Sequence, residues 1–428
     1  MNRTASPRHI LIFEAYTDAN IGSGALVENT VKLLKDKYPE AEIKIMAHYP
    51  DAFHYENVES IPDVYEYPYL KPRWFQVIWL SKTLLWLSGT YLQAFLFKSK
   101  PFPLFKAKAR YFQWADLAVS VGAERINDKF VNIQVFSALS LGLLKAMGKK
   151  VVFFPSTIGP FFHKPTRWLS SSVLSRLDLV YTRDRQSTQT CLEILKLAPS
   201  KVIETADVAV LQAQEEPGKS WELLGSFWGK PLPVGTPLVG ISALEWTYRA
   251  NKVETQYSNY ESYIREMVKL ADALVERYKV KIVFFPTNYR IHGCRDDDAA
   301  VCRLIRDKMA DPASAILIDR LTTPSQFKGM LACSQVNIVT RMHACILSTG
   351  AGVPTLSVNY LFKLREYMES LGLGGFSIDI EEFNAPAMLE IFDKMWNARG
   401  DWSLRINEAV DRKKESLQKS LERMDEFI

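Results

Sequence analysis

The chain has 428 residues, of which 47% are hydrophobic and 24% charged, and its formal net charge at pH 7 is +5. This length and apolar content are sufficient for two domains, each with its own core. The small positive excess does not require nucleic acid, so we expect no nucleic-acid partner. The five cysteines form no Cys-x-x-Cys pair. Their scatter favours reduced thiols in the cytosol over a disulfide framework, and their spacing predicts no metal site.

The first half of the chain alternates short apolar runs with helical stretches. Residues 1–8 are polar and lead directly into a strand, so we expect no secretory signal. The alternation is typical of βαβ units and predicts a parallel sheet. The expected strands are His9–Ala15, Glu42–Ala47, Leu117–Val121, Lys150–Phe154, Asp178–Thr182 and Val202–Glu204.

One apolar segment, 74–97, interrupts this alternation. Its only charge is Lys82, and no acidic residue occurs between positions 67 and 115. A transmembrane span, a buried helix and an interfacial helix pair on anionic lipid are the three interpretations. The lysine opposes a span, because its insertion costs about 3 kcal/mol, whereas the basic flanks and tryptophans favour the interfacial helices. We therefore interpret 71–112 as an insertion that docks on an anionic membrane surface.

A change in composition separates the two halves. Glu-Glu-Pro-Gly and Lys-Pro-Leu-Pro in 213–235 predict a linker between an N-terminal domain, 1–212, and a C-terminal domain, 236–395. The charged amphipathic segment 396–428 is expected to be a helix that packs back on the N-terminal domain. The expected strands of the second half are Leu238–Ala243, Lys281–Phe285, Ala315–Asp319, Asn337–Thr340 and Thr355–Val358.

The two halves also repeat each other in detail. The Val-Val-Phe-Phe-Pro of 151–155 recurs as Ile-Val-Phe-Phe-Pro in 282–286, and the Thr-Arg that ends 179–183 recurs at the end of 337–341. Convergence on parallel-sheet composition is the alternative explanation, but the shared endings favour duplication. The predicted fold class is α/β, with two Rossmann-like doubly wound domains facing a cleft.

Charged and titratable side chains follow two successive strands of the second half. Arg341 and His343 come after one strand, and Tyr360 and Lys363 come after the next. Ligands of parallel α/β sheets bind outside the carboxyl ends of the strands, and a helix N-terminus offers N–H groups to an anion. The pattern predicts a site for a small anionic substrate. The alternative is an ordinary core helix whose histidine satisfies a backbone group.

The same residues carry a family resemblance. Arg-Met-His-Ala at 341–344, Gly-Val-Pro at 352–354 and the Tyr-x-x-Lys of Tyr360 and Lys363 resemble the C-terminal signature of the polysaccharide pyruvyl transferases. Four further motifs resemble that family in the same order, so that the similarity runs from about residue 9 to 375; they lie at 18–26, 115–123, 154–160 and 182–187.

The resemblance implies a reaction and a donor site. Members of the family transfer the pyruvyl unit of phosphoenolpyruvate to sugar hydroxyls of cell-surface glycans, on a glycosyltransferase-B-like fold. This chemistry requires no metal or organic cofactor. The resemblance implies that His343 and Arg341 are catalytic, His343 as the acid/base, and that Lys363 and Tyr360 bind the donor. The family tends to have an arginine near position 244, where this chain has a leucine, so either Arg249 replaces that arginine or the donor differs.

The resemblance places acceptor binding on the N-terminal domain. The candidates are Asn20, Gly22, Ser23, Glu124, Ser156 and Thr157. Ser23 stands where the family usually has an aspartate, so any role of that carboxylate is lost. The alternatives are an ordinary tight turn for the loop at 20–24 and a surface charge for the glutamate.

Three functions remain open from the sequence. The first is transfer of a pyruvyl group to a polysaccharide precursor, which is expected to be lipid-linked, to form a ketal. The second is a nucleotide-sugar glycosyltransferase on the same scaffold, and the third is a non-catalytic glycan-assembly protein. The expected partners are phosphoenolpyruvate, a glycan acceptor and an anionic membrane surface, with a homo-oligomer left open. The expected location is the cytoplasm, peripheral on the inner face of the membrane.

Overall fold

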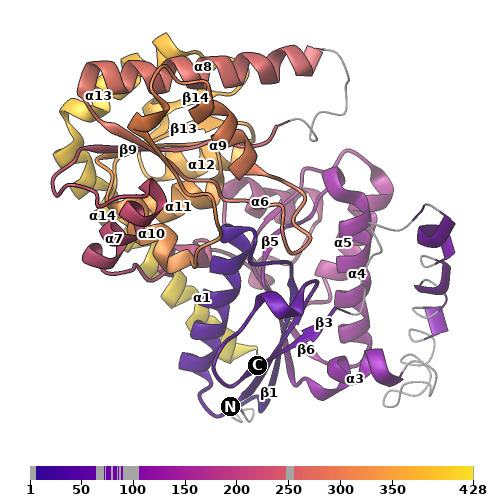
Figure 1. The fold of residues 1–428 in the computed structure, drawn as a ribbon. Coiled ribbons are helices and arrows are strands. Elements are labelled where there is room, and N and C mark those ends of the chain that lie inside the picture. Colours follow the sequence, from indigo (N-terminus) through magenta and orange to yellow (C-terminus); the bar gives the residue numbers. More distant parts are fainter. Residues whose placement is uncertain are drawn as a thin grey trace. The chain divides into compact units, whose positions relative to one another are not determined.

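A computed structural model describes residues 6–63, 106–246 and 255–427, together with short pieces between positions 72 and 89. The chain divides into two compact units. Unit 1 contains Met1–Thr17, Leu26–Val208 and Ser416–Ile428, and unit 2 contains Asp18–Ala25 and Ala209–Glu415. Figure 1 shows the fold coloured along the sequence.

Unit 1 is built on a parallel sheet, which has eight strands in the part of the chain that the structure describes. The strand order is β3-β2-β1-β4-β6-β7-β8, and β5 pairs with β6. The strands are β1 (His9–Ala15), β2 (Glu42–Ala47), β3 (Val58–Pro62), β4 (Leu117–Ser120), β5 (Ala123–Ile126), β6 (Lys150–Ile158), β7 (Leu179–Thr182) and β8 (Val202–Glu204).

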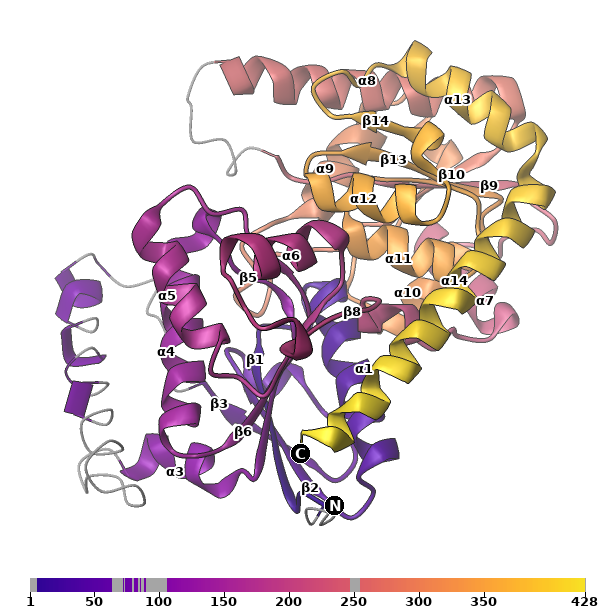
Figure 2. The ribbon, with the colours of Figure 1, turned by 180° about the vertical axis from the view of Figure 1, so that it is seen from behind.

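Helices cover both faces of this sheet, as in doubly wound folds (Figures 1 and 2). Helices α4 and α5 pack against each other on one side, and α1 lies on the other. Apolar side chains of the central strands, such as Leu11, Phe13 and Phe153, form the core with α4. The helices are α1 (Ile21–Lys37), α3 (Lys106–Trp114), α4 (Val131–Ala146), α5 (Lys164–Leu174) and α6 (Arg185–Gln189).

Unit 2 repeats this architecture with a second parallel sheet. Its strand order is β11-β10-β9-β12-β13-β14. The strands are β9 (Leu238–Ser242), β10 (Lys281–Phe284), β11 (Ala315–Leu317), β12 (Val336–Val339), β13 (Thr355–Asn359) and β14 (Ser377–Asp379). Helix α8 contacts both α9 and α13 on one side, and α7, α10, α11 and α12 follow one another on the other (Figure 2).

The helices of unit 2 begin with α7, which lies where the sequence predicts a linker. The stretch 213–235 is not an extended linker, because Leu224 of α7 is buried in the apolar core of unit 2. The helices are α7 (Pro217–Trp228), α8 (Thr255–Tyr278), α9 (Asp298–Asp307), α10 (Pro324–Ala332), α11 (Met342–Gly350), α12 (Phe362–Ser370), α13 (Ala385–Asn397) and α14 (Arg399–Glu422).

The end of α14 belongs to unit 1. The Tyr181 hydroxyl donates to the carbonyl oxygen of Ser420 at 2.8 Å, and the Lys37 ammonium lies 2.8 Å from the Asp425 carboxylate. Leu417 and Met424 are fully buried. The chain therefore returns to unit 1 only after it has passed through all the residues of unit 2.

The apolar segment 74–97 lies largely outside the described residues. In the pieces that the structure describes, Trp74, Val77 and Leu85 are exposed. Among the described residues there is no helix with the length and apolarity needed to cross a bilayer.

Candidate active site

The carboxyl edge of the unit 2 sheet has a topological switch point between β9 and β12. The chain proceeds from β9 to β10 on one side and from β12 to β13 on the other. Such switch points form the ligand crevice of open α/β sheets. Glu245 follows β9, Arg341 and His343 follow β12, and Tyr360 and Lys363 follow β13, so the sequence identified residues at this edge.

Arg341 is buried here between two carboxylates. Its Nη2 lies 2.8 Å from Asp296 Oδ2 and 2.6 Å from Asp298 Oδ1, and its Nε donates to Asp298 Oδ2 at 3.0 Å. Burial acts to lower the pKa of Arg341, but electrostatic interactions with Asp298, Tyr360 and Asp296 outweigh it and raise that pKa well above its usual value. The guanidinium is thus already bound by protein carboxylates.

Asp298 joins three strand ends. In addition to Arg341, its carboxylate accepts from the Thr287 hydroxyl at 3.0 Å and from the Glu245 backbone N–H at 3.0 Å. Asp298 is fully buried, and such a buried charge is maintained only when it is paired. The candidates predicted from the sequence do not include this junction. The sequence feature that could have indicated it is the run of three aspartates at 296–298, but the residues that these aspartates bind are distant in the sequence.

Glu245 occupies the region where the family tends to have an arginine. Its carboxylate accepts from the Asp297 N–H at 2.8 Å and lies 3.0 Å from Nη2 of Arg290. The Arg290 side chain is largely exposed, and this arginine was not among the sequence candidates. Arg249, the candidate replacement, lies outside the described residues.

His343 packs against the start of α1. A Cβ placed on Gly22 would lie 2.2 Å from His343 Nδ1 and 2.4 Å from its Cγ, so the absence of a side chain at position 22 permits the contact. His343 as a whole is half-buried in the first turn of α11, and its Nε2 is buried. The sequence predicts acceptor binding for Gly22 and catalysis for His343, and the structure brings the two residues into contact.

The loop before α1 is held in unit 2 by backbone hydrogen bonds. The N–H of Ile21 donates to Thr287 at 2.9 Å, and the N–H of Tyr289 donates to Ala19 at 3.0 Å. Asn20 caps α1 by accepting from the Ser23 N–H at 2.8 Å. Asn20, Gly22 and Ser23 are therefore part of unit 2, although the sequence analysis placed them in the N-terminal domain.

Helices α11 and α12 begin at N-cap residues that supply no side-chain cap. Their N-cap residues, Arg341 and Leu361, make no capping hydrogen bond, whereas Asp297 caps α9 and Thr323 caps α10. The N–H groups of an uncapped first turn, with the helix dipole, favour an anion. Lys363, which is 9% exposed, lies in the first turn of α12.

Two of the predicted acceptor residues in unit 1 are fully buried. The Ser156 hydroxyl donates to the Phe154 carbonyl at 2.8 Å, and the Thr157 hydroxyl donates to Asp184 at 2.8 Å. Arg183 donates to that same threonine at 2.9 Å and pairs with a buried aspartate. These hydroxyls are directed at internal partners, so an acceptor role for Ser156 and Thr157 stays a prediction.

Glu124, on β5, is half-buried with Lys129 3.8 Å away.

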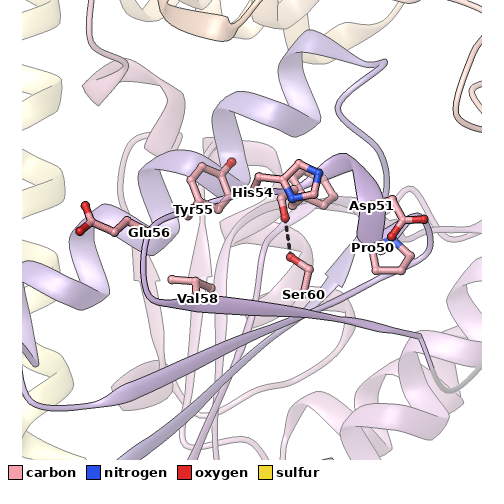
Figure 3. Close-up of a pocket in the computed structure, with 8 residues that line it drawn as sticks. Pro50, Asp51, His54, Tyr55, Glu56, Val58 and Ser60 are labelled. Carbon is pink, nitrogen blue, oxygen red and sulfur yellow. Dashed lines mark hydrogen bonds between the residues drawn. The ribbon is translucent and has the colours of Figure 1, made fainter.

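A separate hollow of about 380 Å³ lies in unit 1 beside β3 (Figure 3). The short connection from β2 to β3 forms it, and the Ser60 hydroxyl closes its base by donating to the Phe53 carbonyl at 2.6 Å. None of the residues that line it is among the candidates predicted from the sequence. Among the described residues, no group of three His, Cys, Asp or Glu side chains is arranged to hold a metal ion.

The sequence profile of the family described as polysaccharide pyruvyl transferase matches residues 20–361. The chain belongs to the polysaccharide pyruvyl transferase family. It is accordingly a pyruvyltransferase of polysaccharide biosynthesis, and the resemblance seen in the sequence is confirmed. The amylovoran biosynthesis protein AmsJ of Erwinia amylovora is 22% identical over 385 residues, which are 87% of this chain and 88% of AmsJ.

Solved structures similar to this pyruvyl transferase confirm its predicted fold class. A glycosyltransferase from Rickettsia africae has a TM-score of 0.57 and 13% identity, with 99% of both chains covered. The UDP-GlcNAc 2-epimerase of Methanocaldococcus jannaschii has a TM-score of 0.57 and 10% identity, with 96% of this chain and 99% of that chain covered. At these identities the likeness concerns the fold alone, which is α/β with two Rossmann-like domains of the glycosyltransferase-B type.

Proposed function

We propose that this pyruvyl transferase uses phosphoenolpyruvate as its donor and forms a pyruvate ketal on a lipid-linked polysaccharide precursor. Membership of the family supports the pyruvyl transfer, and AmsJ is named for the biosynthesis of a polysaccharide. The donor, the lipid-linked acceptor and a peripheral position on the inner face of the cytoplasmic membrane are our proposals.

The strongest support for an anionic donor is the pair of helix starts after β12 and β13. These parallel strands are neighbours, so α11 and α12 both begin at the carboxyl edge of the sheet. Phosphoenolpyruvate carries a phosphate and a carboxylate, and helix N-termini and an ammonium group are the partners that such anions prefer. Lys363 supplies the ammonium group, and Tyr360 orients one of the two anionic groups.

His343 is the proposed acid/base. In the first step a proton goes to the methylene carbon of the donor while a sugar hydroxyl oxygen bonds to C2 and loses its own proton. In the second step another sugar hydroxyl bonds to C2 and gives up its proton, the C2–O bond to phosphate breaks with its electron pair staying on the phosphate, and inorganic phosphate leaves with that proton. The proton transfers require a group that titrates near neutrality, which is the property of histidine.

Arg341 has a different role in this proposal. Its two carboxylate partners offset its charge, so we assign it to holding the strand ends rather than to binding the donor. Through Asp298 it fixes the start of α11 and thereby the position of His343. It acts on the reaction through the histidine.

The test is a donor assay on the purified full-length protein with a glycan acceptor. We expect release of inorganic phosphate from phosphoenolpyruvate and a mass gain of the acceptor that matches one ketal. The variant His343→Ala should lower kcat by about 10²–10⁴-fold, the usual contribution of a general acid or base. Release of a nucleoside diphosphate from a nucleotide sugar, with none of phosphate, would identify a glycosyltransferase instead.

A further inference from the structure

Glu14, in unit 1, has an unusual backbone and an unusual environment. Its φ is +67°, a left-handed conformation, and its side chain is buried near the end of β1. A glycine adopts this conformation without steric cost, whereas a side chain with a Cβ is disfavoured there. The backbone geometry alone therefore gives no reason for a carboxylate at this position, and residues held in strained conformations cluster at functional sites.

The Glu14 carboxylate is surrounded by polar partners from three other elements. It accepts from the Ser120 hydroxyl at the end of β4, at 2.5 Å. The Arg125 guanidinium of β5 donates to the Glu14 backbone carbonyl, and its charge also acts on the carboxylate. Burial raises the pKa of Glu14; Arg125, Ser120 and Ser137 act against this, and the charge of Asp63 adds to it.

This cluster lies at the switch point of the unit 1 sheet. Strands β1 and β4 are neighbours, and the chain leaves them in opposite directions, toward β2 and toward β6. The carboxyl edge at such a point is where open α/β sheets bind ligands. Three rings follow β1 and β2 at the same edge, with centroid separations of 6.0 Å for Tyr16 and His48 and 4.8 Å for His48 and Tyr49.

Arg125 is half-buried, and part of its guanidinium group can still donate hydrogen bonds to a ligand. Its Nη2 donates to the Glu14 carbonyl, while its other guanidinium N–H groups have no acceptor within the part of the chain that the structure describes. An arginine fork presents several donors to a carboxylate or a phosphate. The hydrogen bond to the Glu14 backbone carbonyl and the charge attraction of the nearby carboxylate together hold the guanidinium at the edge of the sheet.

We propose that Glu14 is a positioning residue that holds Arg125 at the switch point of unit 1, where the guanidinium binds an anionic group of the sugar acceptor. This inference rests on the proposed function for the existence of that acceptor. The anionic group is a carboxylate of an acidic sugar or a phosphate attached to the sugar, because both match the arginine fork. Glu14 acts through Arg125 and does not itself contact the acceptor.

The test measures binding of three probes to the full-length protein by ligand-observed NMR, with no donor present. The probes are galactose, galacturonate and galactose 1-phosphate. We expect at least one of the two anionic sugars to bind about tenfold or more tightly than galactose, the worth of one charge-assisted hydrogen bond. The identity of that sugar distinguishes the carboxylate from the phosphate.

The variants separate positioning from a general structural effect. Arg125→Ala should abolish the preference for the anionic sugar, and Arg125→Lys should retain part of it. Glu14→Gln should weaken it, and the double variant should bind as Arg125→Ala does, because Glu14 acts only through the arginine. Glu204→Gln, at the end of β8, is the control with unchanged preference. The thermal transition of each variant is recorded alongside.

Three results would overturn the inference. The first is equal binding of the three probes by the wild type, which includes the case in which no probe binds. The second is a preference for the anionic sugar that survives in Arg125→Ala. The third is additive effects of the Glu14 and Arg125 substitutions. None of these results depends on turnover of phosphoenolpyruvate. The proposed function fails instead when the wild type releases no phosphate, so the two failures are distinguishable.

Discussion

Gly22 is required by its contact with His343 rather than by its backbone conformation. We predict that Gly22→Ala destabilises the protein by about 1–3 kcal/mol, the usual cost of overpacking a filled site. The three atoms nearest to the added Cβ all belong to the His343 side chain. The cost should therefore largely disappear when Gly22→Ala is made in a His343→Gly background. Urea unfolding of the four proteins in this double-mutant cycle measures the coupling.

Gly218→Ala is the matched control for this cycle. Gly218 is the second residue of α7, as Gly22 is of α1, but no atom lies within 4 Å of its Cβ position among the described residues. Because alanine favours a helix over glycine by up to about 1 kcal/mol, this variant should be neutral or slightly more stable. An equal loss of stability at both positions would mean that the contact with His343 is not the cause.

Lys363 gives a kinetic prediction at the same scale. Lys363→Ala should raise the KM for phosphoenolpyruvate by about tenfold or more, the worth of a charge-assisted hydrogen bond, and leave the KM for the acceptor nearly unchanged. Steady-state rates with each substrate varied separately test this, with the exposed Lys219→Ala as the control. A defect confined to the acceptor would contradict the donor role of this lysine.

Single residues differ in how far the sequence predicts their roles. His343 and Lys363 could be placed at a ligand edge, because a polar residue directly after an apolar strand must lie there. The partners of Arg341 could not be foreseen, since Asp296 and Asp298 lie on another strand connection. Glu14 was missed for a different reason, because no sequence pattern marks a positive φ at a residue other than glycine.

Helix α10 carries a buried lysine whose charge opposes folding near neutral pH. Desolvation, aided by the charge of Lys414, lowers the pKa of Lys328 from 10.5 to about 8. Its ammonium donates to the Gln212 carbonyl at 2.7 Å. Each pKa unit corresponds to about 1.4 kcal/mol, and the lost hydrogen bond costs about 1 kcal/mol. We therefore predict that Lys328→Met raises the free energy of unfolding at pH 7 by about 2 kcal/mol.

The difference in unfolding free energy between Lys328→Met and the wild type should depend on pH, in a direction that follows from the lowered pKa of Lys328. Between pH 8 and 10.5 the unfolded lysine still holds a proton that the folded one has released, so this group makes stability rise with pH. The advantage of Lys328→Met should accordingly shrink across this window. Urea midpoints of both proteins from pH 7 to 10 measure it, with Lys219→Met as an exposed control. A difference that is constant with pH would rule out the charge of Lys328 as its cause.

The strands that the sequence failed to predict share one physical property. Strands β3 and β14 lie at the edges of their sheets, and β5 pairs only with β6. Because such strands bury little of their surface, they carry polar residues, as in Val-Glu-Ser-Ile-Pro and Ala-Glu-Arg-Ile. The central strands were predictable because both of their faces are covered, which produces continuous apolar runs. Helix α7 was missed because Pro217 and Gly218 resemble loop residues, although proline is well tolerated in a first helical turn.

The whole molecule is expected to bind anionic membranes through 71–112. We predict that it co-sediments with phosphatidylglycerol vesicles but not with phosphatidylcholine vesicles, and that binding weakens as salt rises. Each basic residue near the lipid contributes about 1 kcal/mol, and salt screens this attraction. Replacing Lys106, Lys108 and Arg110 together by glutamine should reduce binding.

Two other outcomes would give this segment a different assignment. Retention in native membranes through alkaline carbonate treatment would indicate a transmembrane span. An absence of vesicle binding at every salt concentration would favour a helix that is buried in the protein.

The division of the chain between the two units affects the order in which they can fold. Domains generally fold as units during synthesis, the N-terminal one first. Here unit 2 has all of its residues once Glu415 has been made, whereas unit 1 still lacks Ser416–Ile428, which include the buried side chains of Leu417 and Met424. The unit that begins the chain is therefore the last to be completed, and during translation its core remains open at the site of the end of α14 until unit 2 has been synthesised.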